Sequence, residues 1–83
     1  MPYVIDLTDD GVADDLVRLQ EWALDSLLEA LTDAAQDPHR LDVLLDMWPS
    51  SRVLDFADGR GVCLVEIVED DKRIALRQVI APQ

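Results

Sequence analysis

The chain has 83 residues, which leave room for a single domain (1–83) with one hydrophobic core. Hydrophobic residues make up 49% of the chain and charged residues 30%, a composition typical of globular and not of disordered proteins. Eighteen acidic residues against seven basic ones give a net charge of −11, which disfavours unassisted binding to a nucleic-acid backbone.

The single cysteine, Cys63, excludes an internal disulfide and a cysteine-based metal cluster. The first ten residues, MPYVIDLTDD, have neither a basic region nor a long apolar run, so they do not predict a signal peptide. No run of about 18 apolar residues, as a membrane-spanning helix requires, occurs in the sequence. We therefore expect a cytoplasmic protein without a membrane partner. We expect no cofactor. We also expect no metal, because the carboxylates do not match the spacing of a calcium-binding loop.

The charge is distributed unevenly along the chain. Residues 1–51 contain 12 acidic residues and only two basic ones, Arg18 and Arg40. Residues 52–83 contain 6 acidic and 5 basic residues and are therefore almost neutral. Any basic patch must come mainly from the C-terminal third.

Alternation in residues 3–8 predicts a half-buried strand, and the acidic residues that follow it are typical of a helix N-cap. Leucines and alanines then recur at helical spacing through residues 12–36. This pattern alone leaves open whether the segment is one helix or two. Because residues 20–22 interrupt the apolar face, we expect a helical hairpin, which ends near Asp37-Pro38.

Residues 39–51 contain leucines with helical spacing at positions 41, 44 and 45, but Pro49 stops the pattern, so we expect a single helical turn or an ordered loop. From residue 52 the apolar period becomes two, which predicts strands over 52–57, 62–68 and 73–80 with turns between them. Segment 62–68 is apolar on both faces, so we expect a central strand covered on both sides. Residues 81–83 would form a tail.

The predicted order is β-α-α-β-β-β. It describes an α+β domain in which the helical hairpin packs on a mostly antiparallel four-stranded sheet. The order and spacing resemble those of the RelE/ParE toxin family, over nearly the whole chain. The segments that carry the resemblance are YVIDLTDDGVADDLVRL, LDSLLEALTDAAQDPHR and RVLDFADGRGVCLVEIVEDDKRIALRQVI.

The resemblance implies the toxin of a type II toxin–antitoxin pair, which is neutralised by a cognate antitoxin. RelE-like members cut mRNA on the ribosome and ParE-like members poison DNA gyrase, so both targets are implied. Cleavage by the RelE-like members depends on a basic and aromatic cluster on the sheet. Arg52 matches the family's basic residue at the start of the second strand, and Arg73 and Arg77 lie on the C-terminal strand. These three arginines are the catalytic candidates, and Arg60 is a candidate contact to RNA or another target.

Two departures from the family pattern leave endoribonuclease activity open. Gly61-Val62 stand where the family has an arginine, and Ala81-Pro82-Gln83 replace its usual terminal histidine–arginine or tyrosine. The residues also allow a structural interpretation of the catalytic candidates. The arginines of the strands would then pair with carboxylates across the sheet, at Asp55, Glu66 or Glu69, and Arg60 would be a solvated loop residue.

Three large side chains, Trp22, Met47 and Trp48, are candidate anchors for a partner. For Trp48 we favour the alternative that it covers the core, because a small domain needs every large apolar side chain. His39 follows the second helix and is expected to cap its C-terminus. Cys63, which lies among valines and leucine, is expected to be a small buried hydrophobic residue.

Two further functions remain open. An acidic binding protein would use Asp25, Glu29 and Asp33, one turn apart, to imitate nucleic-acid phosphates in a basic groove. The same row is also typical of an ordinary solubilising surface. A homodimer without chemistry would use Met47 and Trp48 at its contact.

Overall fold

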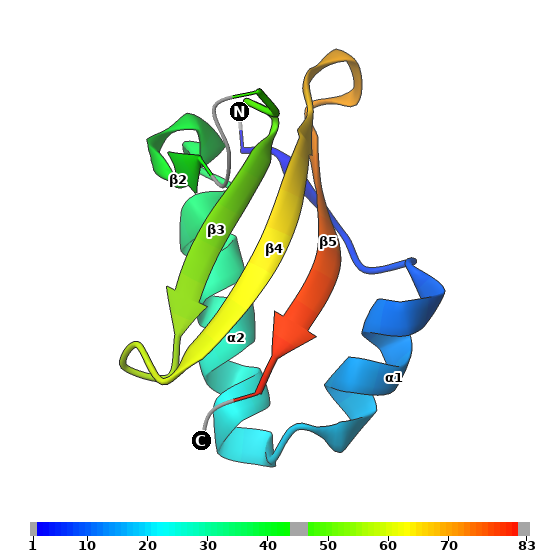
Figure 1. Ribbon diagram of the computed structural model, residues 1–83, viewed down its shortest axis with the longest axis vertical. Helices are drawn as coiled ribbons and strands as arrows, with labels where there is room; N and C mark the ends of the chain where they lie inside the picture. Colours follow the sequence, from blue (N-terminus) through cyan, green and yellow to red (C-terminus); the bar gives the residue numbers. More distant parts are fainter. Residues whose placement is uncertain (1, 44–46, 82–83) are drawn as a thin grey trace.

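The computed structural model describes residues 2–43 and 47–81, which form two helices packed on a five-stranded sheet (Figure 1). The helices are α1 (Asp10–Arg18) and α2 (Glu21–Ala34). The strands are β1 (Val4–Asp6), β2 (Asp42–Val43), β3 (Ser51–Phe56), β4 (Gly61–Val68) and β5 (Arg73–Ile80). Two short 3-10 turns, η1 (Pro38–Arg40) and η2 (Glu69–Asp71), precede β2 and β5. The predicted α+β class is confirmed.

The strand order is β1-β5-β4-β3-β2. The pairs β2–β3, β3–β4 and β4–β5 are antiparallel, whereas β1 lies at one edge and pairs parallel to β5. The mostly antiparallel sheet is therefore confirmed, but the prediction of four strands is wrong, because β2 adds a fifth. This two-residue strand is too short to show a period of two in the sequence.

Residues 12–36 contain most of α1 and all of α2, so the expected pair of helices is confirmed. Asp9 caps α1, and its carboxylate accepts hydrogen bonds from the backbone N–H groups of Gly11 and Val12 at 3.0 and 3.4 Å. Leu19 and Gln20 then take extended backbone conformations, with ψ of 142° and 152°, and separate α1 from α2. Because Leu19 packs against the core, the break between the helices also buries apolar surface.

The core lies between the helices and one face of the sheet. Val12 from α1 and Leu27 and Leu31 from α2 are fully buried. They belong to one cluster with buried side chains of the three long strands, among them Phe56, Cys63, Val65, Ile67, Ile74 and Leu76. Cys63 is inaccessible to solvent, which confirms its prediction as a buried hydrophobic residue, and burial raises the pKa of its thiol to about 12.

The other face of the sheet, which we call the open face, carries no helix of the described residues (Figure 1). Along β4, buried residues alternate with half-buried ones, and the half-buried positions are Val62, Leu64, Glu66 and Val68. The expectation that β4 is covered on both sides is therefore wrong, although its central position is confirmed. Two short helices supply only one covering layer, so apolar side chains remain at the surface of the open face.

The segment between α2 and β3 begins with the single turn that we expected, η1, and continues into β2. Leu44 and Leu45, part of the predicted pattern, lie outside the described residues, as do Pro82 and Gln83 of the predicted tail.

Trp48 is 54% exposed, so the expectation that it covers the core is wrong. The predicted hairpin between β3 and β4 is confirmed, with positive φ angles at residues 57–59.

Candidate functional site

The open face has an apolar centre. Val53 on β3 lies opposite Leu64 on β4, and Val62 on β4 lies opposite Ile80 on β5. Residues that face each other across a strand pair share one side of the sheet, so these four side chains form a continuous apolar strip. Ile80 is 48% exposed and the other three are half-buried. Such a strip suits contact with another apolar surface.

Arg77 lies beside this strip, at an irregularity in the pairing of β4 with β5. The register shifts between Leu64 and Val65, so Arg77 is the extra residue of β5 at this point. Its guanidinium lies 3.2 Å from the Glu66 carboxylate and 3.7 Å from that of Asp9. The predicted pairing with Glu66 is thus confirmed. Because Asp9 caps α1, the same arginine also joins that helix to the sheet.

Arg73 lies at the start of β5, also on the open face. It forms ion pairs with Asp6 on the neighbouring β1 and with Asp71 in η2. Two hydrogen bonds from Thr8, through its hydroxyl and its backbone N–H, lower the pKa of Asp6 to about 2, and Arg73 adds to the effect. The partners of Arg73 differ from those that the sequence suggested. The outcome is nevertheless the same, since both arginines of β5 are engaged by carboxylates.

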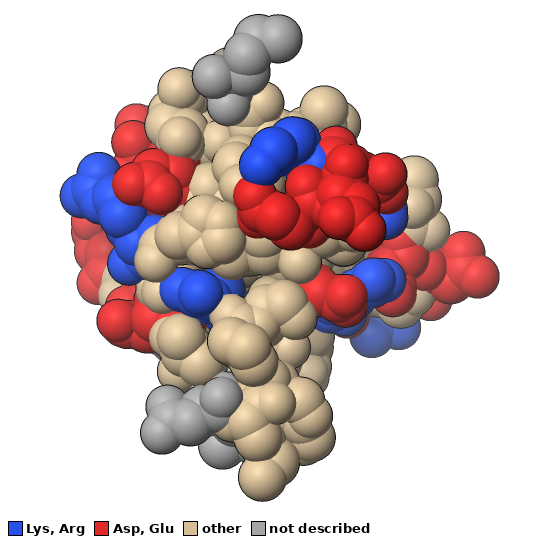
Figure 2. Space-filling model, turned by 90° about the horizontal axis from the view of Figure 1, so that it is seen from above, with Lys and Arg blue, Asp and Glu red and all other residues tan. Residues whose placement is uncertain are grey.

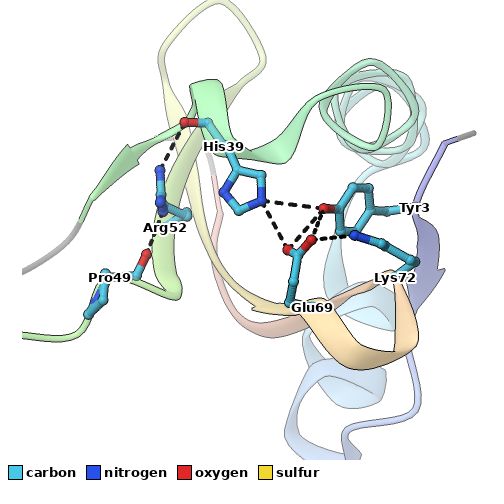
Figure 3. Close-up of polar contacts among 6 residues, drawn as sticks. All are labelled: Tyr3, His39, Pro49, Arg52, Glu69 and Lys72. Atoms are coloured by element: carbon cyan, nitrogen blue, oxygen red, sulfur yellow. Dashed lines mark hydrogen bonds and ion pairs between the residues drawn. The ribbon is translucent and has the colours of Figure 1, made fainter.

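Arg52 lies away from the other two arginines. Its cross-strand neighbour, Val65, is buried, so Arg52 points to the side of the sheet that carries the helices. Its guanidinium donates to the backbone carbonyls of Pro49 and His39 at 2.7 and 3.0 Å (Figure 3). It also donates to the carbonyl of Leu41 at 2.9 Å. The catalytic candidate Arg52 therefore does not share a surface with Arg73 and Arg77, and its donors stabilise the segment between α2 and β3.

The predicted partner anchors do not form one surface. Trp22 lies at the start of α2, near the β3–β4 loop, where the guanidinium of Arg60 lies 5.6 Å from its ring centroid. Arg60 is exposed in the β3–β4 turn, as expected of a solvated loop residue, and its guanidinium also lies over this aromatic ring. Met47 and Trp48 precede β3 at the opposite end of that strand. Trp22, Met47 and Trp48 are 47%, 75% and 54% exposed, so each is accessible to a partner.

A polar cluster that sequence reasoning missed joins the residue before β1 to η1 and to η2 with its C-cap (Figure 3). The hydroxyl of Tyr3 donates to the Glu69 carboxylate at 2.8 Å, and the Nε2 atom of His39 lies 3.0 Å from the same carboxylate. Lys72 forms an ion pair with Glu69 as well. We call these four residues the Glu69 cluster. His39 thus contacts Glu69 instead of capping α2, and its expected role as a cap is wrong.

The carboxylate of Glu69 is the electrostatic centre of this cluster. Hydrogen bonds from Lys72, Tyr3 and His39 lower the pKa of Glu69 to about 2, and the hydrogen bond to the same carboxylate raises the pKa of Tyr3. The side chains of His39, Glu69 and Lys72 are each about half exposed or more, so water screens their attraction. Tyr3 and Glu69 are 66 residues apart in the sequence, so no local pattern could have revealed the contact.

Acidic side chains dominate a second region, along the outer face of α2. Asp25, Glu29 and Asp33 are all exposed, as the sequence predicted. Glu29 and Asp33 also line a groove of about 870 Å³ together with Asp55 and Asp58 near the β3–β4 loop. At the end of the molecule seen in Figure 2, basic groups lie close to acidic ones and form no continuous basic surface among the described residues. The described residues contain no cluster of potential metal ligands and no helix suited to crossing a membrane.

Comparisons with known proteins identify the fold. No protein-family model and no curated protein matches the sequence. Among solved structures, the chain is similar to a double arginine-to-alanine mutant of the E. coli toxin RelE in the free state. That match has a TM-score of 0.83, with 12% identity over 98% of this chain and 84% of the other. It is also similar to a chain of the toxin–antitoxin complex RelBE2 from Mycobacterium tuberculosis. There the TM-score is 0.75, with 20% identity over 95% of this chain and 90% of the other.

Proposed function

We propose that this chain, which has the RelE-like toxin fold, is the toxin component of a type II toxin–antitoxin pair and is neutralised by a cognate antitoxin. The observation that carries the proposal is the match of fold over 98% of the chain, with no large part of it left unmatched. The neighbour from a toxin–antitoxin complex supports an antitoxin as partner. The partly exposed apolar strip of the open face adds a surface that an antitoxin could cover.

The contacts of the three candidate arginines bear on which activity the toxin would have. Ribosome-dependent mRNA cleavage needs cationic groups that contact phosphate and stabilise the developing charge. Here Arg73 and Arg77 each lie between two carboxylates, and Arg52 donates to three carbonyls. Contact with RNA would require exchange of these ion pairs. We therefore propose antitoxin binding as the principal interaction, with mRNA cleavage and gyrase inhibition as the two activities to be tested.

Growth of a bacterial host during induced expression tests the proposal. We expect the chain alone to arrest growth, and co-expression of the small protein encoded beside it to restore growth. The double variant Arg73→Ala/Arg77→Ala should relieve the arrest if these arginines act on the target, whereas Arg40→Ala, a control at an exposed position in η1, should not. Normal growth at a high level of soluble protein would overturn the toxic activity. In that case, failure of the neighbouring protein to bind the chain would overturn the proposal as a whole.

The acidic surface favours a second candidate function, that of a nucleic-acid mimic which occupies the basic groove of an enzyme. The exposed row Asp25, Glu29 and Asp33 and the adjacent carboxylates Asp55 and Asp58 are the observations in its favour. Salt titration of any complex separates the two candidates. The affinity of a mimic should collapse as ionic strength rises, whereas an antitoxin seated on the apolar strip should lose much less affinity.

A further inference from the structure

The central strand β4 carries apolar side chains on both of its faces, although the two helices lie on only one of them (Figure 1). Val62, Leu64 and Val68 lie on the open face and remain half-buried. A strand of this composition is typical of a sheet that is covered on both sides. The apolar strip of the open face therefore has the character of a surface that receives a further layer.

The charged groups beside this strip differ between its two sides. On the side of β5, the two arginines of that strand are each paired with two carboxylates of the same chain. On the other side, Asp42 of β2 lies opposite Val53 and Asp55 of β3 lies opposite Val62. Both aspartates therefore lie on the open face, and both are exposed. Neither forms an ion pair among the described residues, so this side keeps its negative charge.

A hollow of about 270 Å³, which we call the Asp42 hollow, lies at this edge of the sheet. Six residues line it: Arg40, Leu41, Asp42, Val53, Leu54 and Asp55. Two carboxylates against one guanidinium leave an excess of negative charge. The side chain of an arginine or a lysine suits such a hollow, because its methylene groups pack on apolar side chains while its charged end contacts a carboxylate.

We propose that Asp42 and Asp55 select the partner of the open face, and that this partner is an amphipathic helix of the antitoxin with aliphatic side chains on the strip and a basic side chain in the Asp42 hollow. The inference rests on the proposed function and adds the chemistry and the orientation of the antitoxin segment. Its basic residue would lie over β2 and β3. The part over β5 needs no charge, because the arginines there have carboxylate partners.

The position of the strip favours a helix over an added strand. The strip crosses β3, β4 and β5, whose backbone groups pair with each other or with β1 and β2, so contact there is made by side chains. RNA is a poorer occupant, since the carboxylates of Asp42 and Asp55 would repel its phosphates. In this arrangement the strip supplies most of the affinity and the two aspartates supply the selection.

Fluorescence anisotropy on the intact chain tests the inference. The probe is a labelled helical peptide of about 18 residues with leucines along one face and two arginines on one flank. Its matched control has glutamine at both arginines. We expect the arginine peptide to bind at least about fivefold more tightly than the glutamine peptide. The variant Asp42→Asn/Asp55→Asn should remove this preference and still bind the glutamine peptide. Asp25→Asn/Glu29→Gln, which removes two negative charges on the outer face of α2, should keep the preference.

A second variant tests the strip. Ile80→Ser replaces a strip side chain that is 48% exposed, and it should weaken both peptides alike, about fivefold. Val17→Ser, at an 85% exposed position of α1, is the matched control and should weaken neither. Circular dichroism confirms that each variant is folded.

The inference is overturned if neither peptide binds, if both bind equally, or if Asp42→Asn/Asp55→Asn keeps the preference. It is also overturned if oligouridine displaces the arginine peptide, or if light scattering shows a dimer that Ile80→Ser dissociates. The protein encoded beside the chain separates the inference from the proposed function. Its failure to bind at all overturns the proposed function. Binding that Asp42→Asn/Asp55→Asn leaves unchanged overturns the inference alone, whereas we expect that variant to weaken it about fivefold.

Discussion

Gly61 begins β4 opposite Phe56, and the ring of Phe56 occupies the space where a side chain at residue 61 would lie. A Cβ atom at this position would come within 2.6 Å of that ring. Phe56 is itself buried, so the ring cannot turn away without disturbing the core. The glycine of the predicted turn is therefore needed for packing as well as for the path of the chain.

We predict that Gly61→Ala lowers the free energy of unfolding by about 1–3 kcal/mol through overpacking against Phe56. Urea unfolding followed by circular dichroism measures the change. Gly11→Ala is the control, because a Cβ atom there meets only the Asp9 carboxylate at 3.4 Å. Alanine favours the helix, so the control should be neutral or stabilising by up to about 1 kcal/mol. Equal losses in both variants would contradict the packing argument.

Asp6 gives a prediction on pH. Its pKa in the folded protein is lowered to about 2 by Thr8 and Arg73, from an ordinary value of 3.8. A carboxylate with a lowered pKa stabilises the fold above its unfolded pKa, and this contribution is lost as the pH falls from about 4 to about 2. Asp6→Asn should therefore be less stable than the parent at pH 7, and the difference should shrink across this window. Unfolding curves at pH 7, 4 and 2 test this, and a difference that stays constant with pH would contradict it.

At the scale of the elements, the segment between α2 and β3 depends on one side chain. Arg52 reaches from β3 to carbonyls in η1, just before β2 and in the turn before β3. We predict that Arg52→Met lowers the free energy of unfolding by about 1–3 kcal/mol, because carbonyls lose a charged donor. Hydrogen exchange of residues 39–43 should accelerate more than exchange in α1. Arg40→Met, at an exposed position of η1, is the control. Unchanged hydrogen exchange of residues 39–43 in the Arg52→Met variant would contradict this structural role and would leave Arg52 available for a role in binding.

The elements themselves follow largely from local patterns in the sequence. The boundaries of β5 and the cap at Asp9 were predicted because periodicity and capping depend on neighbouring residues. Arg52 and His39 could not be placed, because their partners come from other elements. The open face was missed for a similar reason: an apolar strand indicates burial, but the sequence does not say how many layers are available to cover it.

At the scale of the whole molecule, the excess of acidic residues opposes compaction. Asp25, Glu29 and Asp33 are one turn apart on α2, and none of them forms an ion pair among the described residues. Repulsion between like charges at this spacing costs a few tenths of a kcal/mol per pair. The same excess favours solubility and discourages association with other acidic molecules.

We predict that the melting temperature rises by about 4 °C or more when NaCl is raised from about 0.1 M to about 1 M, since this shortens the Debye length from about 10 Å to about 3 Å. Differential scanning calorimetry at constant pH measures the shift. The variant Asp25→Asn/Glu29→Gln/Asp33→Asn should melt at a higher temperature at low salt and respond less to added salt. A fall in melting temperature with salt would mean that the surface ion pairs outweigh the repulsion.

The position of β5 between β1 and β4 has a consequence for how the protein is made. The first strand finds its hydrogen-bonding partner only in the last one, so the sheet cannot be completed while residues 73–80 remain inside the ribosomal exit tunnel. A nascent chain therefore stays without its finished sheet until β5 has left the tunnel. A product truncated before residue 73 would lack the strand that both β1 and β4 require.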